Sequence, residues 1–156
     1  MNQNDFTLPD IELGLGVELA AAITAMPVSR LIGLRVLGFA SGGRSVLELP
    51  ITPQLTFDGR RVQGGIVGML ADYAGVSATS VTLAPGWAAS TTGFQVHNVA
   101  PAQGERLVAV GKAVQVGKTH AVSTVHVWAC SGKQATLVAV ATTTCRPFQT
   151  ADASGK

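Results

Sequence analysis

The stretch "RRVQGGIVGMLADYAG", residues 60–75, decides the fold of this chain. Two arginines and a Gln-Gly-Gly corner lead into an apolar run that holds a single acid, Asp72. Burying an unpaired carboxylate is unfavourable, so Asp72 must face water, meet a partner or take part in chemistry. Apolar residues recur at helical spacing from Gly64 to about Leu83, which predicts one long helix.

The two faces of this expected helix differ in side-chain size. One broad face carries Ile66, Met69, Leu70, Tyr73, Ser77 and Val81. The opposite side carries Gly68, Gly75 and Thr79, with Asp72 at its margin. Such small residues let another backbone approach closely, which favours packing on a strand or a partner chain. Alternatively, they leave room for a slender substrate beside the carboxylate.

The remaining sequence is typical of strands around that helix. Residues 12–26 predict a short helix ended by Pro27, and residues 31–40 and 44–52 predict a hairpin. Four strand-like runs follow the long helix, at 90–100, 106–116, 120–130 and 135–148. In the third run, odd-numbered positions from Ala121 to Ala129 share one face. Short turns between these runs predict an antiparallel sheet with the long helix buried against it, an α+β class.

Composition limits the class of protein. The 156 residues predict a single domain, 1–156, with residues 1–10 and 149–156 as disordered tails. With 47% hydrophobic and 13% charged residues, the chain has the composition of a folded domain with some apolar surface left for an oligomer interface. The net charge of +2 is scattered, which argues against nucleic acid as a partner.

Location and metal binding are also constrained. The N-terminal residues lack a basic start followed by an apolar core, and Asp72 makes residues 64–83 a poor membrane span, so we expect a cytoplasmic protein. Cys130 and Cys145 predict neither a disulfide framework nor a zinc site. Three histidines (His97, His120 and His126) lack zinc-ligand spacing, so no metal site is expected.

The stretch "GRRVQGGIVGMLADYAG" resembles the signature of hotdog-fold acyl-CoA thioesterases of the phenylacetate-degradation type, in the 4-hydroxybenzoyl-CoA thioesterase superfamily. That signature has a Gly, a His or Gln before Gly-Gly, and an acid eight residues after the first of these glycines. Gly59, Gln63, Gly64-Gly65 and Asp72 match it. The resemblance extends to "PVSRLIGLRV" (27–36) and to the strand block that begins "TTGFQVHNVAPAQGE". It implies one long central helix wrapped by a mostly antiparallel sheet of five to six strands.

The resemblance also implies roles. The Gly64 amide would polarise the thioester carbonyl, and Asp72 of the partner subunit would act as general base or nucleophile. Gln63 would orient the thioester or water, and Thr91 would hold the water. Substrate contacts would come from Gly65, Ser90, Lys118, Arg60 and Arg61, the last three at coenzyme A phosphates. Coenzyme A is then part of the substrate, no cofactor is needed, and the protein is a homo-oligomer, either a dimer or a dimer of dimers.

Helix geometry also favours a site shared between two subunits. Gly64 and Asp72 are about 12 Å apart along a helix axis, too far to act on one carbonyl within one chain. A symmetric pair of antiparallel helices would bring each helix start beside the other chain's Asp72. Relatives often carry His where Gln63 stands, and Gln can position a group but cannot shuttle a proton. Many also carry Asn six residues earlier, where Phe57 stands here; Asp58 is the neighbouring polar residue that could replace it.

Three functions fit these residues. The first is a thioesterase that hydrolyses an acyl- or aryl-CoA to acid and coenzyme A. The second is a hotdog protein that binds acyl-CoA without turning it over. The third is a hotdog dehydratase, which needs a His paired with an acid near the helix start, and Gln63 disfavours it. Asp72 favours the thioesterase over the binder, because mere binding does not require a buried carboxylate beside polarised amides.

Overall fold

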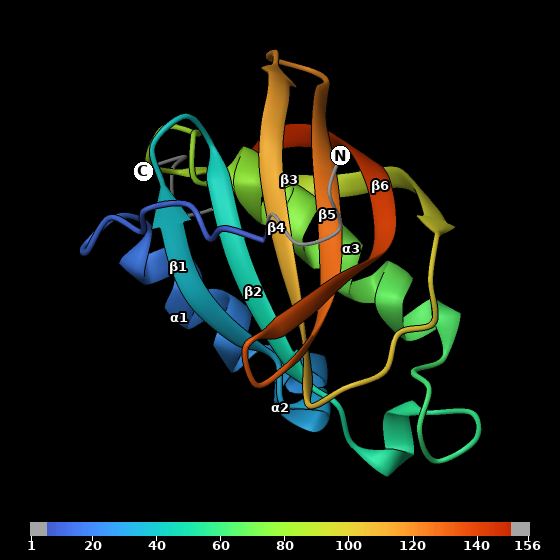
Figure 1. Ribbon diagram of the computed structural model, residues 1–156. Coiled ribbons are helices and arrows are strands. Elements are labelled where there is room, and N and C mark those ends of the chain that lie inside the picture. The colour runs from blue at the N-terminus through green and yellow to red at the C-terminus, as the bar shows by residue number, and fades with distance from the viewer. Residues whose placement is uncertain (1–5, 151–156) are drawn as a thin grey trace.

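A computed structural model of the chain describes residues 6–150 and shows one sheet wrapped around one long helix (Figure 1). The helices are α1 (Val17–Ala25), α2 (Pro27–Ile32) and α3 (Gly64–Ser80), with a short 3-10 turn, η1 (Pro53–Leu55). The strands are β1 (Arg35–Ala40), β2 (Arg44–Pro50), β3 (Trp87–Asn98), β4 (Arg106–Val116), β5 (Ala121–Ser131) and β6 (Gln134–Gln149). The expected long helix is confirmed, and it ends three residues earlier than predicted.

The six strands form one sheet in the order β1-β2-β4-β5-β6-β3. Every neighbouring pair is antiparallel, so the predicted hairpin and the predicted antiparallel sheet are confirmed. β3 and β4 follow one another in the chain but do not pair, because β5 and β6 lie between them. β3 therefore occupies one edge of the sheet, beside β6. One long helix on a six-stranded antiparallel sheet is the hotdog fold.

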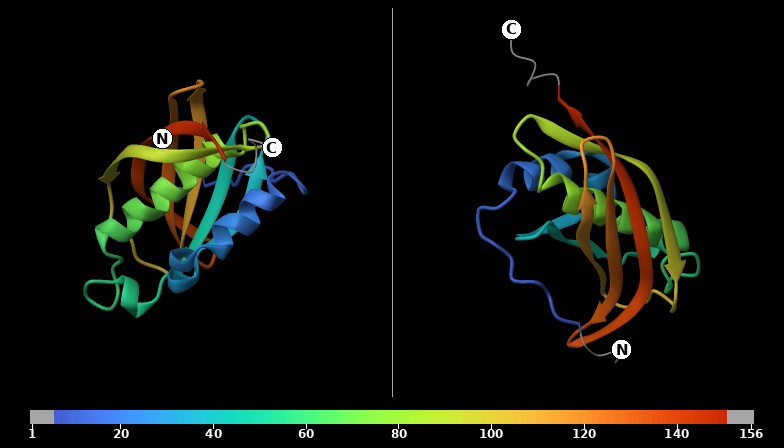
Figure 2. Two further views of the ribbon diagram at one scale, coloured as in Figure 1. Left: turned by 180° about the vertical axis from the view of Figure 1, so that it is seen from behind. Right: turned by 90° about the horizontal axis from the view of Figure 1, so that it is seen from above.

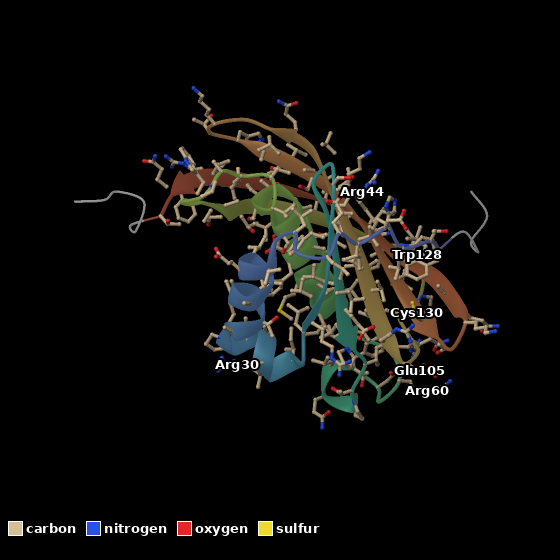
Figure 3. All side chains as sticks on the ribbon, turned by 90° about the vertical axis from the view of Figure 1, so that its left-hand side faces the viewer. Arg30, Arg44, Arg60, Glu105, Trp128 and Cys130 are labelled. Carbon is tan, nitrogen blue, oxygen red and sulfur yellow. The ribbon has the colours of Figure 1, made fainter. Side chains whose placement is uncertain are left out.

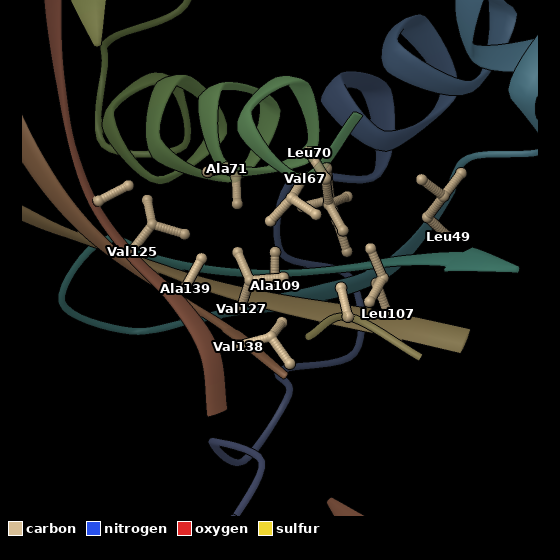
Figure 4. Packing of buried hydrophobic residues seen from close by; sticks show 14 of the residues in the cluster. Leu49, Val67, Leu70, Ala71, Leu107, Ala109, Val125, Val127, Val138 and Ala139 are labelled. Carbon is tan, nitrogen blue, oxygen red and sulfur yellow. The ribbon is translucent and has the colours of Figure 1, made fainter. Parts of the chain in front are cut away.

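The core lies between α3 and the sheet (Figure 4). Val67, Leu70 and Ala71 of α3 are buried against residues of β4, β5 and β6. The buried partners shown there include Leu107, Ala109, Val125, Val127, Val138 and Ala139. On β5 the odd-numbered positions from Ala121 to Ala129 share one face, as the alternation predicts, and the structure buries that face. Burying apolar area between helix and sheet is the main stabilising contribution to such a core.

The small residues of α3 serve packing against strands. A Cβ on Gly75 of α3 would lie 2.5 Å from the Thr143 Cβ of β6. On the sheet side, a Cβ on Gly111 of β4 would lie 2.3 Å from the Ala74 carbonyl oxygen of α3. A Cβ on Gly68 would lie 3.3 Å from the Phe94 ring. These glycines allow the helix backbone to approach β3, β4 and β6 closely. Of the two explanations for the small residues, close packing on strands applies to Gly68 and Gly75.

The N-terminal third differs from the prediction in two places. The helix expected over 12–26 begins at Val17, because Gly14 and Gly16 adopt left-handed conformations before it. Pro27 does end α1, but it also begins α2, where a first-turn proline is favoured because that position needs no amide donor. α2 ends at the left-handed Gly33, so the strand expected from residue 31 begins only at Arg35.

The N-terminal segment crosses the face of the sheet that points away from α3. Phe6 packs on Trp128 with ring centroids 5.2 Å apart, and Ile11 lies against Gly38 of β1. The expected N-terminal tail is therefore wrong for residues 6–10, because Phe6 contacts the sheet. The expected C-terminal tail is wrong at Gln149, which belongs to β6. The other expected tail residues, 1–5 and 151–156, lie outside the described part of the chain. From this crossing the chain passes to α1, which lies alongside α3 (Figure 2).

Candidate active site

Asp72 and Thr91 form the centre of the candidate site. Thr91 Oγ1 donates a 2.8 Å hydrogen bond to Asp72 Oδ1, which joins α3 to β3. Both side chains are half-buried. Within residues 6–150, neither carboxylate oxygen accepts another hydrogen bond or meets a cation. Asp72 Oδ2 is therefore available to a substrate or a water molecule.

The environment of Asp72 makes its carboxylate a stronger base than a solvated one. Desolvation raises the pKa of Asp72, and the hydrogen bond from Thr91 partly offsets that rise. Cys145 lies close by on β6, directly across from Thr91. Burial raises the pKa of the Cys145 thiol, and the charge of Asp72 raises it further, while a hydrogen bond with Thr79 lowers it. Cys145 is thus a protonated, buried thiol that packs beside the site.

The start of α3 presents one free amide. Gln63 is the N-cap residue, and its Oε1 accepts a 2.5 Å hydrogen bond from the Gly65 amide. The Gln63 carbonyl accepts from the Ile66 and Val67 amides. Within the described residues, the Gly64 amide has no acceptor. The amide of Gly65 is therefore occupied by Gln63, whereas the amide of Gly64 is free and lies at the positive end of a helix.

β3 runs antiparallel to α3 and covers one stripe of it. Gly64 lies beside the Asn98 side chain, Gly68 beside Phe94 and Val96, and Asp72 beside Thr91. Asn98, which the sequence did not single out, thus places an amide at the helix start. In a regular strand, Thr91 and Asn98 would point to opposite faces of the sheet. A β-bulge between Thr91 and Gly93 brings them to the same face, so the strand pattern alone could not identify Asn98. Asp72 and Gly64 remain about two helical turns apart in one chain.

The loop before α3 is organised around Asp58. Its carboxylate accepts from the Arg60 and Arg61 amides at 3.0 and 2.7 Å and pairs with Arg61 Nε at 2.7 Å. The hydrogen bonds from Arg61 lower the pKa of Asp58 to about 2. The Arg61 guanidinium also stacks on the Phe57 ring at 5.0 Å. Arg61 and Asp58 are therefore engaged with each other in the loop, where they stabilise its turn.

Arg60 and Lys118 lie at opposite ends of the sheet. Arg60, labelled in Figure 3, lines a cleft of about 710 Å³ that loop residues Ala100, Pro101, Gln103 and Gly104 also line. Lys118 is exposed in the turn after β4, next to Ala121, which is in cross-strand register with Cys145 and through it with Thr91. β5 separates the two ends by about 30 Å at the usual rise of a strand. One chain therefore brings Lys118, but not Arg60, to the Thr91 end of the sheet.

A groove of about 1240 Å³ opens from Asp72 along the C-terminal half of α3. α1 forms one wall. The segment that leads into β3 and the first residues of β3, including the exposed Ser90, form the other. The lining is mostly apolar, with Val17, Leu19, Ile23, Met26, Val76, Val81, Leu83 and Trp87 among its residues. Within residues 6–150, no helix is long and apolar enough to cross a membrane.

Comparison with known proteins identifies the structural neighbours of this chain. No protein-family model and no curated protein sequence matches it. A thioesterase family protein from Silicibacter pomeroyi is 26% identical, with 88% of this chain and 100% of that chain covered and a TM-score of 0.81. A thioesterase from Haemophilus influenzae (16% identity, 94% of each chain, TM-score 0.75) shares the fold. So does the PaaI protein of the E. coli phenylacetic acid degradation operon (20% identity, 82% of this chain and 88% of that one, TM-score 0.69). The structural neighbours are thus thioesterase-superfamily proteins, which supports thioesterase activity in general.

Proposed function

We propose that this chain, whose structural neighbours are thioesterase-superfamily proteins, hydrolyses an acyl-CoA thioester to the free acid and coenzyme A. The observation that carries the proposal is Asp72, a half-buried carboxylate with one hydrogen-bond partner and a raised pKa, at the mouth of an apolar groove. A carboxylate held this way is a functional-site candidate because a purely structural one is normally paired with a cation or with several donors.

The chemistry follows from where charge develops. The oxygen of a water molecule attacks the thioester carbonyl carbon while Asp72 accepts a proton from that water. The carbonyl oxygen becomes negative, and the free Gly64 amide at a helix start stabilises it. The carbon–sulfur bond then breaks, the electron pair leaves with sulfur, and the thiolate or thiol of coenzyme A departs. Alternatively, Asp72 attacks the carbonyl itself and forms an anhydride that water opens.

A site shared between two subunits reconciles Gly64 with Asp72. β3 is a 12-residue edge strand with one side facing no other strand of the described chain. Two β3 strands pairing antiparallel, about a two-fold axis between Phe94 and Gln95, would set Thr91 opposite Asn98 of the partner subunit. Because Asn98 lies beside Gly64 and Thr91 beside Asp72, each Asp72 would then meet the helix start of the other chain.

The same pairing would unite the two cations expected at coenzyme A. Lys118 belongs to the Thr91 end of the sheet, and Arg60 belongs to the loop that leads into α3. In the pair, Lys118 of one subunit would approach the start of α3 in the other subunit. Arg60 of that other subunit lies in the loop leading into the same helix start, so the two cations would be neighbours. Arg61, which is already paired with Asp58, would contribute through the shape of the loop rather than through a phosphate contact.

The test compares the wild type with Asp72→Asn on a panel of aryl-, short- and medium-chain acyl-CoA thioesters, with Asp10→Asn as an exposed control acid. We expect Asp72→Asn to fold and bind acyl-CoA but to lose roughly two or more orders of magnitude in turnover. Equal hydrolysis by all three proteins would make Asp72 structural. Tight binding with no hydrolysis by the wild type would favour the acyl-CoA-binding alternative.

The same enzyme can separate the two mechanisms. Single-turnover hydrolysis in isotopically labelled water puts the label in the released acid if water attacks the thioester directly. If Asp72 attacks and water then opens the anhydride at the Asp72 carbonyl, an oxygen of Asp72 passes to the acid and the label enters the Asp72 carboxylate. Mass spectrometry of the peptide that contains Asp72 would detect this label, and its presence establishes the anhydride.

A further inference from the structure

We infer that the groove between α1 and α3 receives the acyl chain of the thioester and selects an uncharged, apolar chain of about ten carbon atoms. This inference rests on the proposed thioesterase function, because it assigns the chemistry of the acyl group at the same site. The groove is the larger of the two hollows described above, and Asp72 and Thr91 line its beginning.

The floor of the groove continues the stripe that carries the candidate base. Residues four apart on a helix are neighbours along an inclined ridge, so Gly64, Gly68, Asp72, Val76 and Ser80 form one line that winds slowly around α3. β3 covers the first part of that line, as far as Asp72. Beyond Asp72 the line is open, and Val76 and Ser80 line the groove. A chain attached to a carbonyl at Asp72 therefore has one open direction along the helix, toward Ser80.

The walls are apolar side chains that the monomer leaves partly exposed. Val17 is 61% exposed, Met26 42% and Trp87 38%, and all three line the groove. Exposed apolar residues gathered in one hollow mark a binding surface more often than scattered ones do. The α1 wall is held in place at its end, because Tyr73 donates to Met26 Sδ at 3.8 Å and accepts from the buried Ser29 hydroxyl at 3.2 Å.

The length of the groove sets the length of the chain. From Asp72 to Ser80 the helix rises about 12 Å. A carbon–carbon bond of about 1.5 Å advances an extended chain by about 1.25 Å, so roughly ten carbons span that distance. Burying each methylene group of such a chain is favourable, so affinity should rise with length until the groove is filled.

The charges of the groove exclude acyl groups with a second carboxylate. Among its described lining residues, Asp72 and Glu18 are the charged ones, and both are acids. With no lysine or arginine in that lining, a carboxylate at the far end of the chain would lose its hydration without gaining a partner. Dicarboxylyl-CoA thioesters should therefore be poor substrates beside monocarboxylic ones of the same length.

Two adjacent alanines on α1 provide a matched pair of variants. Ala22 is exposed and lines the groove, whereas Ala21 is exposed and does not. Ala22 lies one helical turn before Met26, whose sulfur contacts Tyr73 near Asp72. Ala22→Trp should therefore block the groove part of the way from Asp72 and leave room for a short chain only. Ala21→Trp adds the same bulk to the same helix outside the groove.

The experiment measures binding and hydrolysis separately. Binding of the non-hydrolysable thioethers decyl-CoA and butyl-CoA is measured by calorimetry. The ratio kcat/KM is measured for butanoyl-, decanoyl- and adipoyl-CoA, with hexanoyl-CoA as the uncharged match to adipoyl-CoA in length. In the wild type and in Ala21→Trp, we expect decyl-CoA to bind at least about tenfold more tightly than butyl-CoA. In Ala22→Trp this preference should disappear while butyl-CoA binding is kept. Ser80→Phe, which narrows the far end from α3, should likewise weaken decyl-CoA alone and serves if Ala22→Trp fails to fold.

The outcomes separate the inference from the proposed function. Hydrolysis with no preference for decyl over butyl chains, or a preference that survives both groove variants, overturns the acyl groove and leaves the thioesterase standing. Chain-length-dependent binding that the groove variants abolish, without hydrolysis of any thioester, supports the groove and overturns the thioesterase. Hydrolysis of adipoyl-CoA as efficiently as hexanoyl-CoA overturns the exclusion of charged chains.

Discussion

Thr91 Oγ1 donates to Asp72 Oδ1 across 2.8 Å, although the two residues are 19 positions apart in sequence and belong to different elements. This hydrogen bond is the described contact that opposes the effect of burial on the carboxylate. It connects the edge strand of the sheet to the helix stripe that leads into the groove.

Thr91→Val should lower kcat/KM by about ten- to a hundredfold, the effect of a hydrogen bond to a charged group. Loss of the donor lets the pKa of Asp72 rise further, and the base is active only when ionised. The acid limb of the pH–rate profile should therefore move to higher pH. Thr91→Ser, which keeps the hydroxyl, should retain the wild-type profile. Thr92→Val is the control, because Thr92 bonds to Thr144 instead; an equal shift there would contradict a specific role for Thr91.

The raised pKa of Asp72 predicts a pH-dependent gain in stability for Asp72→Asn. A carboxyl with a raised folded-state pKa binds its proton more tightly when folded, so wild-type stability falls as pH rises from about 3.8 through the folded-state pKa. The variant has no such loss. Its Tm should exceed that of the wild type at pH 7, and the difference should shrink toward zero below pH 4. A lower Tm at neutral pH would show that the carboxylate is stabilising.

Lys118→Ala should raise the KM for CoA thioesters more than it changes kcat. An exposed cation in a turn attracts phosphates by a screened interaction, so the effect should weaken with added salt. A truncated thioester without the nucleotide should show no difference between the two proteins. Lys133→Ala, in the exposed turn between β5 and β6 at the other end of the sheet, is the matched control. Equal losses on the full and truncated substrates would argue against phosphate recognition.

Mixed dimers test whether the site is shared. Gly64 does not have a positive φ, so Gly64→Pro is compatible with the first turn of α3 and removes the free amide. Losing one oxyanion donor should lower turnover by about 10²- to 10³-fold. Asp72→Ala should be inactive on its own. Refolded together, the two variants should form some dimers with one intact site and recover a fraction of wild-type activity.

The mixing experiment requires that the wild type be a dimer or a larger oligomer, so the oligomeric state is measured as its control. Sedimentation of the wild type at micromolar concentration should show a dimer or a larger species. Mass spectrometry of differently tagged chains establishes that mixed dimers form. If they form and stay inactive, Gly64 and Asp72 do not serve one site in trans. A stable wild-type monomer would contradict the shared site more directly.

Gly75→Ala should destabilise the fold although alanine favours a helix by about 1 kcal/mol. The added Cβ would lie 2.5 Å from the Thr143 Cβ, which is fixed to the backbone of β6 and cannot rotate away. Overpacking of this kind costs about 1–3 kcal/mol. Gly68→Ala, whose nearest contact would be 3.3 Å, should be milder. Chemical denaturation of the two variants should rank them in that order; the reverse order would show that β3, not β6, limits the approach to α3.

The sequence by itself determined the elements and the chemical candidates. Local periodicity suffices for this, because a helix from Gly64 and alternation along β5 depend on neighbours in the chain. Residues 60–75 also identify the two chemical candidates. Asp72 is the single acid of an apolar helix, and the Gly64 amide lies at a helix start, where amides lack partners within the helix. The expected helix start at residue 12 and strand start at residue 31 were wrong. Left-handed Gly14 and Gly16 precede α1, and Pro27 begins a second helix as well as ending the first.

Only the tertiary structure decided which of these residues meet. Pairing of β3 with β6, which depends on contacts far apart in sequence, brings Thr91 to Asp72 and Asn98 to Gly64. The bulge after Thr91 changes which residues of β3 face the helix, and no local pattern announces it. The groove, likewise, exists because α1 contacts β1 and α2 and leaves Val76 and Ser80 of α3 uncovered. Residue types and spacing supply the chemistry, whereas long-range packing sets the distances over which that chemistry can act.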